Sequence, residues 1–262
     1  MTTSFLTRQA STPRNLVDLL DPGPRRIATL LFAFAAVMAF GALTGSGILV
    51  PWKAVLLSLA VAAVPWLAKW HADLRTWGLA VVTLAVMLVA QGLHTAEHVL
   101  QLVQLYLLDW PAGRALGLIS AANVEWIHLA WNLLVLAGVV ILMARGARSP
   151  WAWLLLLWSL LHTGEHGYLF VRSLVVVAQA NALGLEVLPV TQALPGIVGR
   201  DGVLAAQTWC GRIPGLTTAP RVVVHFIWNA GEMALLLAAG HAFLRHQNRL
   251  VSPVPPHADA LK

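Results

Sequence analysis

The chain has 262 residues, of which 58% are hydrophobic and only 11% are charged, and its mean hydropathy is +0.74. These values exclude an ordinary soluble domain and predict a membrane protein with several spans, since each span needs roughly 20 apolar residues. The single cysteine, Cys210, excludes an internal disulfide framework and a thiolate-rich metal site. The net charge of +6 mostly reflects Lys and Arg in loops and tails, so we expect a lipid bilayer and no nucleic acid as partner.

The apolar runs predict an all-α polytopic membrane protein with about six transmembrane helices. In chain order, the runs lie at residues 27–46, 49–68, 77–106, 122–144, 151–172 and 222–244. The chain therefore divides into an N-terminal segment, five helices, a connection, a sixth helix and a tail, at residues 1–26, 27–172, 173–221, 222–244 and 245–262. The connection is rich in Gly and Pro, and we interpret it as an outer loop that acts as a lid.

The distribution of basic residues predicts the orientation of these helices. With the N-terminus inside, eleven of the 17 Lys and Arg residues fall in inner segments. Basic residues concentrate on the cytoplasmic side of membrane proteins. We therefore expect a multi-pass protein of the plasma membrane with both termini in the cytoplasm.

Ionisable residues are concentrated inside four of the predicted spans. Four of the five glutamates and six of the ten histidines lie there, namely Glu97, Glu125, Glu165, Glu232, His94, His98, His128, His162, His166 and His225. Each such group in a membrane helix costs on the order of 2–3 kcal/mol or more, so a compensating role is expected.

The ionisable residues follow a duplicated pattern. The string His-Thr-x-Glu-His occurs at residues 94–98 and again at 162–166, and each copy is followed on the next helix by His-x-x-Trp-Asn, at 128–132 and 225–229. At about 100° per residue, the polar residues of each helix share one face. Helix directions place all four motifs in the outer half of the bilayer. Helices three to six are thus predicted to form a duplicated two-helix unit around a His/Glu centre.

Imidazole and carboxylate groups together suit a transition metal, with Fe or Cu expected first and Zn also compatible. The candidate ligands are His94, His98, His128, His162, His166, His225, Glu97, Glu165, Asn132 and Asn229. They exceed the coordination number of one ion, so they fit either two ions or one ion with a complete second layer of orienting groups, and we expect one shared dinuclear site. The candidate catalytic residues are Glu97, Glu125, Glu165 and Glu232, which would bridge metals or move protons.

The His-x-x-x-His spacing of residues 94–98 and 162–166 resembles the histidine boxes of membrane fatty acid desaturases and hydroxylases. That resemblance implies a di-iron site that activates oxygen. The chain lacks the later His-x-x-His-His boxes of those enzymes. The string His-x-x-Glu-His is also similar to the signature of inverzincin zinc proteases. We assign the chain to neither family.

Three functional classes remain open from the sequence. The first is a metal-dependent oxidoreductase, of the oxygenase or hydroxylase kind, that acts on a lipid-soluble or outer-side substrate with an electron donor or a partner membrane subunit. The second is an electron-transfer protein that carries haem b, and the third is a divalent-metal or proton transporter. We expect the first class. A haem protein would leave the glutamates without a role, and a transporter would need the polar stripes to continue into the inner half of the bilayer, which they do not.

Overall fold

The structure is a computed structural model that describes residues 13–119, 124–185, 194–207 and 217–251. Every regular element in these residues is helical, which confirms the predicted all-α fold. The elements, in chain order, are α1 (Leu16–Leu20), the 3-10 helix η1 (Gly23–Arg25), α2 (Arg26–Gly45), α3 (Pro51–Trp77), α4 (Leu79–Tyr106), α5 (Glu125–Ala144), α6 (Pro150–Ala182), α7 (Val203–Gln207) and α8 (Arg221–Val251).

Five of the described helices are long and apolar enough to cross a membrane. These spans are Gly23–Gly45, Pro51–Trp77, Leu79–Tyr106, Glu125–Ala144 and Arg221–Leu250. Helix α6 was expected as a sixth span but is not among them, although its 33 residues exceed the length needed. Its polar motif, His162 to His166, lowers the hydropathy of its central part.

The helix boundaries follow from proline, glycine and capping residues. Proline occupies the first turn of α3 and of α6, where its missing N–H costs no hydrogen bond. The Ser149 side chain caps α6 by accepting from the Ala152 N–H. Gly78 alone separates α3 from α4, and its φ of +81° is a conformation that favours glycine.

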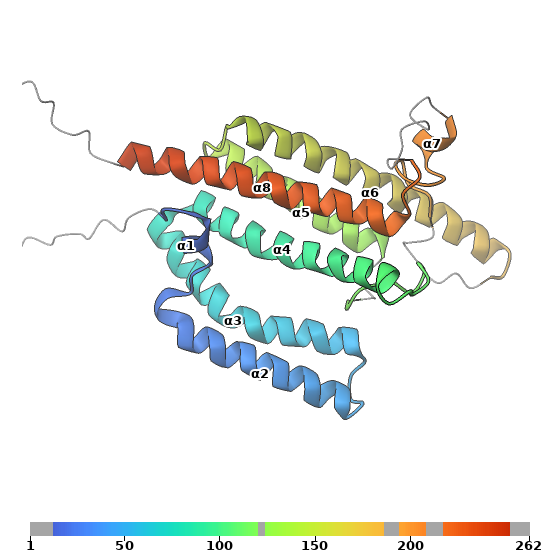
Figure 1. The fold of residues 1–262 in the computed structure, drawn as a ribbon, viewed down its shortest axis with the longest axis horizontal. Helices are drawn as coiled ribbons and strands as arrows, with labels where there is room; N and C mark the ends of the chain where they lie inside the picture. The colour runs from blue at the N-terminus through green and yellow to red at the C-terminus, as the bar shows by residue number, and fades with distance from the viewer. Residues whose placement is uncertain (1–12, 120–123, 186–193, 208–216, 252–262) are drawn as a thin grey trace, which may run out of the picture.

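Helices α4, α5, α6 and α8 form a four-helix bundle, and the α2–α3 hairpin lies along the side of α4 (Figure 1). In the bundle, α4 contacts α5 and α8, and α6 contacts the same two helices from the other side. The short helix α1 lies against α4 and α8. We call the end that holds α7 and the start of α8 the loop end, and the opposite end the termini end.

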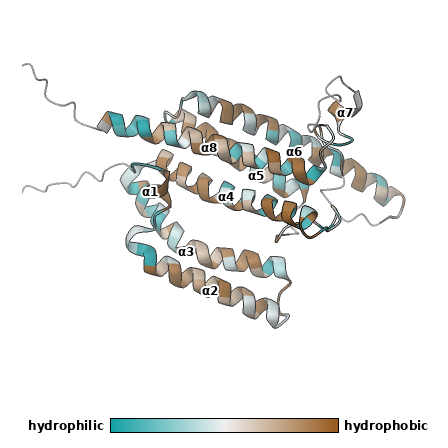
Figure 2. Cartoon of the chain, in the orientation of Figure 1, coloured by the Kyte–Doolittle hydropathy of each residue, from teal (hydrophilic) through white to brown (hydrophobic). Residues whose placement is uncertain are grey.

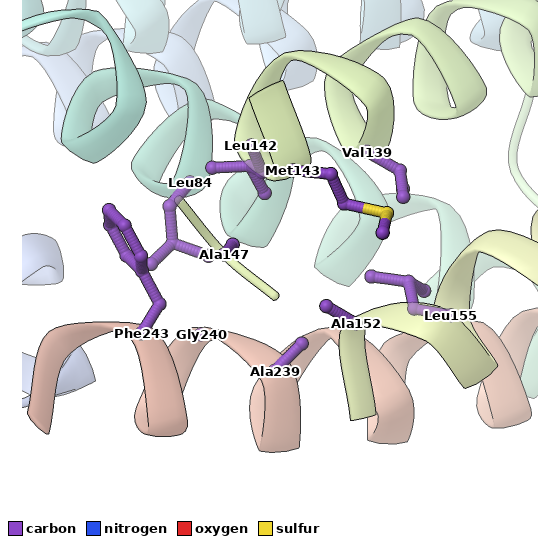
Figure 3. Close-up of a pocket in the computed structure, with 10 residues that line it drawn as sticks. All are labelled: Leu84, Val139, Leu142, Met143, Ala147, Ala152, Leu155, Ala239, Gly240 and Phe243. Carbon is purple, nitrogen blue, oxygen red and sulfur yellow. The ribbon is translucent and has the colours of Figure 1, made fainter. Parts of the chain in front are cut away.

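The termini end of the bundle has an apolar core. Buried leucine, valine and alanine side chains from all four helices meet there, including Leu84, Val139, Leu155 and Leu236. Figure 3 shows Leu84, Val139 and Leu155 beside a cavity of only about 10 Å³, whose ten lining residues are all apolar or glycine. A cavity that small and apolar holds no ordered water.

The outward surfaces of the helices are apolar, as a bilayer requires. On α2, for example, the exposed fractions are 74% for Ile27, 70% for Leu30 and 68% for Val37. Figure 2 shows hydrophobic residues along α2, α3 and α4, and hydrophilic residues at the C-terminal end of α8. Such a continuous exposed apolar surface is stable only against lipid or another protein.

The connection between α6 and α8 differs in extent from the predicted one. The fifth span was expected to end at residue 172, but α6 continues without a break to Ala182 and projects beyond the loop end (Figure 1). Residues 173–182, expected in the connection, therefore belong to the helix because nothing in that stretch breaks it. Parts of the predicted lid, residues 186–193 and 208–216, lie outside the described residues.

Candidate metal centre

Six imidazoles from four helices meet inside the loop end of the bundle. Neighbouring ring centroids lie 4.7 to 6.1 Å apart. Helix α4 supplies His94 and His98, α5 supplies His128, α6 supplies His162 and His166, and α8 supplies His225. Five of the six are buried, and His94 alone is partly exposed. The motifs that the sequence placed at one depth thus share one cluster.

The first triad consists of His94, His98 and His128, and each offers a ring nitrogen within 4.8 Å of the other two. The Nε2 atoms of His94 and His98 face each other at 3.3 Å. His98 Nδ1 lies 2.9 Å from Gln101 Oε1, and His128 Nδ1 lies 3.3 Å from the Val124 carbonyl oxygen. A carbonyl oxygen only accepts, so these Nδ1 atoms donate and their Nε2 atoms carry lone pairs, of which that of His98 accepts from His94 Nε2–H. This group could hold a metal ion.

The second triad consists of His162, His166 and His225. His162 Nδ1 lies 3.3 Å from Glu232 Oε2, and His166 Nδ1 lies 3.2 Å from Glu125 Oε2. The Nε2 atoms of both, and both ring nitrogens of His225, are buried without a hydrogen-bond partner among the described residues. A buried polar atom without a partner costs about 1–3 kcal/mol, so these nitrogens are available to a ligand, although among the described residues only the first triad has ring nitrogens that all lie within 4.8 Å of one another.

The four intramembrane glutamates divide into two pairs with different partners. Glu125 and Glu232 contact imidazoles of the second triad, and Glu232 Oε1 also accepts from Ser159 Oγ. Glu97 accepts instead from the Ile119 N–H at 2.7 Å. Glu165 likewise accepts from the N–H groups of the connection before α8, at residues 197 and 198. The motif glutamates were expected as metal ligands, and here they bind loop backbone.

The two asparagines bind mainly within the bundle. The amide nitrogens of Asn132 and Asn229 donate to the carbonyl oxygens of His128 and His225, at 2.8 and 2.9 Å. Asn229 Oδ1 also accepts from Gln91 Nε2 at 3.0 Å. Asn132 Oδ1 is buried and has no partner among the described residues, so it alone of the two keeps a free acceptor.

Several contacts repeat between the two halves of the site. Thr95 reaches the carbonyl oxygen of Asn229, and Thr163 reaches that of Asn132, at 3.4 and 3.5 Å. Trp131 covers the His94 ring at 5.2 Å, as Trp228 covers the His162 ring at 5.3 Å. The expected duplication therefore extends from the sequence to the packing of the bundle.

Sequence reasoning missed three residues that hold the loop end together. A Cβ atom on Gly117 would collide with the Glu97 carboxylate, and one on Gly196 would collide with that of Glu165. Arg221, at the start of α8, donates from Nη1 to Glu165 Oε1 at 2.6 Å. The signal was present in the sequence, because a glycine followed by two aliphatic residues comes after each motif, as Gly-Leu-Ile and Gly-Ile-Val.

A scan of protein-family models and searches of curated proteins and of solved structures found no match to this chain. The functional argument therefore depends on the geometry of the site. The protein is a membrane-like helical bundle with a buried histidine cluster that could bind metal.

Proposed function

We propose that the chain is an integral-membrane metalloprotein whose two histidine triads each hold one transition-metal ion. The observation that carries the proposal is the state of the ring nitrogens. In four of the imidazoles Nδ1 faces an oxygen acceptor, and the Nε2 atoms of two of these, His162 and His166, are buried without a partner among the described residues. Metal-binding histidines have this arrangement, since the acceptor fixes the ring and makes its other nitrogen more basic.

We propose copper or iron as the metal, with copper favoured. Di-iron bundles surround their ions with several carboxylates, whereas the glutamates here contact imidazoles or loop backbone. A ligand set made only of imidazole nitrogens suits copper well. Such a centre would supply electron exchange with a substrate, so we propose an oxidoreductase that acts on a lipid-soluble or outer-side compound with a separate electron donor or partner subunit.

The glutamates beside the second triad have the role of positioning residues in this proposal. Glu125 and Glu232 accept from imidazole Nδ1 atoms and so hold the rings in place. Glu125 Oε1 has no partner among the described residues, and it is therefore the carboxylate oxygen best placed to take up a proton.

Two observations weigh against the alternative functions. The six imidazoles contact one another, with His128, His166 and His225 stacked at centroid distances of 5.0 to 5.5 Å, which leaves no slot for a haem between them. A transporter needs polar groups on both sides of its site, but the termini end is apolar (Figure 3). Both observations favour a fixed metal centre.

We further propose that the loop end faces the outside of the plasma membrane and that both termini are cytoplasmic. This orientation places eleven of the 17 Lys and Arg residues on the inner side. The metal centre would then lie in the outer half of the bilayer.

The decisive experiment is elemental analysis of the purified protein together with its optical and electron paramagnetic resonance spectra. We expect about two ions of copper or iron per chain, one for each triad of imidazoles. His94→Ala and His162→Ala should each lower the metal content, whereas His241→Ala, an exposed histidine near the termini end of α8, should leave it unchanged. A metal content well below one per chain contradicts the proposal, and a Soret band would select haem instead.

A further inference from the structure

The two halves of the bundle differ at the seam between α6 and α8. There Trp158 fills the space beside the second triad. Its Nε1 donates to the Trp228 carbonyl oxygen at 2.8 Å, and the two indole rings meet edge to face at 4.9 Å. The ring lies so close to Gly231 that a Cβ atom at that position would collide with it. Trp158 therefore closes the seam by packing its large side chain against Gly231.

The corresponding seam between α4 and α5 has one indole in place of two, because Trp131 donates to Gln91 Oε1 at 3.3 Å and covers the His94 ring but carries no counterpart of Trp158. Ala90 precedes the first motif histidine by four residues, as Trp158 precedes the second, and Leu134 stands at the position of Gly231. Leu134 is 70% exposed, so it points away from the seam. Helices α4 and α5 also pack less closely than α6 and α8.

The exposure of the histidines follows this difference. His162, behind the closed seam, is fully buried. His94, its counterpart behind Ala90, is the one imidazole of the six that is partly exposed. About two turns from His94 toward the termini end, Met87 of α4 packs against Gly138 of α5 and closes the seam there. The exposure of the seam is therefore confined to the level of His94.

The surroundings of this opening are apolar. The neighbouring side chains Leu93 and Leu133 are 53% and 50% exposed on the surface that faces lipid. At the loop end, by contrast, the two connections lie over the cluster, and backbone N–H groups in their described parts donate to Glu97 and Glu165. A molecule that reaches His94 through the seam would therefore come from the bilayer.

We infer that the α4–α5 seam at Ala90, His94 and Leu134 is a lateral portal through which an uncharged, lipid-soluble substrate enters the metal centre from the bilayer. This inference rests on the proposed function and specifies its substrate class. The residue that sets access is Ala90, because it carries a methyl group where the other half carries the indole of Trp158 and so leaves Trp131 alone over His94.

The portal can be tested by the rate at which chelators remove the metal from protein in liposomes. The probes are 1,10-phenanthroline, which is uncharged and lipid-soluble, and bathophenanthroline disulfonate, which is charged and stays in water. Ala90→Trp should slow removal by phenanthroline at least about tenfold, equivalent to about 1.4 kcal/mol of barrier. Trp158→Ala should speed removal by opening the second seam. Leu161→Trp, which adds an indole on the exposed face of α6, is the matched control and should change nothing.

The outcomes separate the portal from the metal centre itself. Wild-type protein that binds no metal overturns both proposals. Protein that binds metal but releases it equally fast with tryptophan or alanine at position 90 overturns the portal alone. Faster removal by the charged chelator than by phenanthroline also overturns it, since the route would then be aqueous. If Ala90→Trp does not fold, Ala90→Leu and Trp158→Ala still test the two seams in opposite directions.

Discussion

At the residue scale, the four buried glutamates illustrate how one residue type can serve two purposes in a single bundle. Glu232 sits between Ser159, Gln91 and His162, so its carboxylate is held by three polar side chains. Glu97 instead reaches the backbone beyond the end of its own helix. A buried carboxylate needs such partners, because its desolvation is otherwise costly. The partner of each carboxylate therefore defines its role.

The substitution Glu232→Gln tests the positioning role. It removes the charge that faces His162 Nδ1, and loss of such a partner typically weakens metal binding by about 10–100-fold. Competition with a chelator of known affinity measures the change. Glu97→Gln is the comparison, because Glu97 contacts loop backbone and its replacement should leave metal affinity nearly unchanged. An equal loss in both variants would support the ligand role that the sequence pattern predicts for Glu97.

At the element scale, two connections are joined to the bundle by equivalent contacts. The connection after α4 meets Glu97 at Gly117, where φ is +74°, and the connection before α8 meets Glu165 at Gly196. A side chain at either glycine would push the carboxylate away from the N–H group it binds. Each connection therefore meets the bundle at one glycine and one glutamate, supported by Gln104 at Gly117 and by Arg221 at Glu165.

Gly117→Ala should destabilise the protein by about 1–3 kcal/mol, because it combines a strained backbone with displacement of the Glu97 carboxylate. Thermal unfolding in detergent, followed by circular dichroism, measures this effect. Gly164→Ala is the matched control. No neighbouring atom lies within 4 Å of a Cβ at position 164, and the first copy of the motif already has alanine there. Similar unfolding temperatures for both variants would contradict a stabilising contact between this connection and Glu97.

The same elements mark what sequence reasoning could and could not predict. Helical spacing predicted which faces carry the histidines, and the bundle places those faces together. Spacing could not assign the partners of Glu97, because its Cα lies about 100° around the helix from His98 and its long side chain can turn either to the cluster or to the loop. The end of α6 was also missed, since an apolar helix can continue beyond the bilayer without any sequence signal.

At the scale of the whole molecule, the bundle has a polar half and an apolar half. The histidine cluster occupies the loop end, whereas leucine, valine and alanine fill the termini end. Any metal bound at the cluster is thus separated from the termini end by tightly packed side chains that exchange neither protons nor ions. Chemistry at the centre would communicate with the bilayer and with the loop end only.

We expect the loop end to lie on the outer side of the membrane and the termini end on the cytoplasmic side. Single cysteines introduced into a Cys210→Ser background can report it through a maleimide that does not cross membranes. Ala112→Cys lies exposed at the loop end, and Arg148→Cys lies exposed at the termini end between α5 and α6. Because basic residues favour the cytoplasmic side, intact cells should allow labelling at position 112, and position 148 should react only after lysis. The reverse pattern would place the metal centre in the inner half of the bilayer, open to cytoplasmic electron donors.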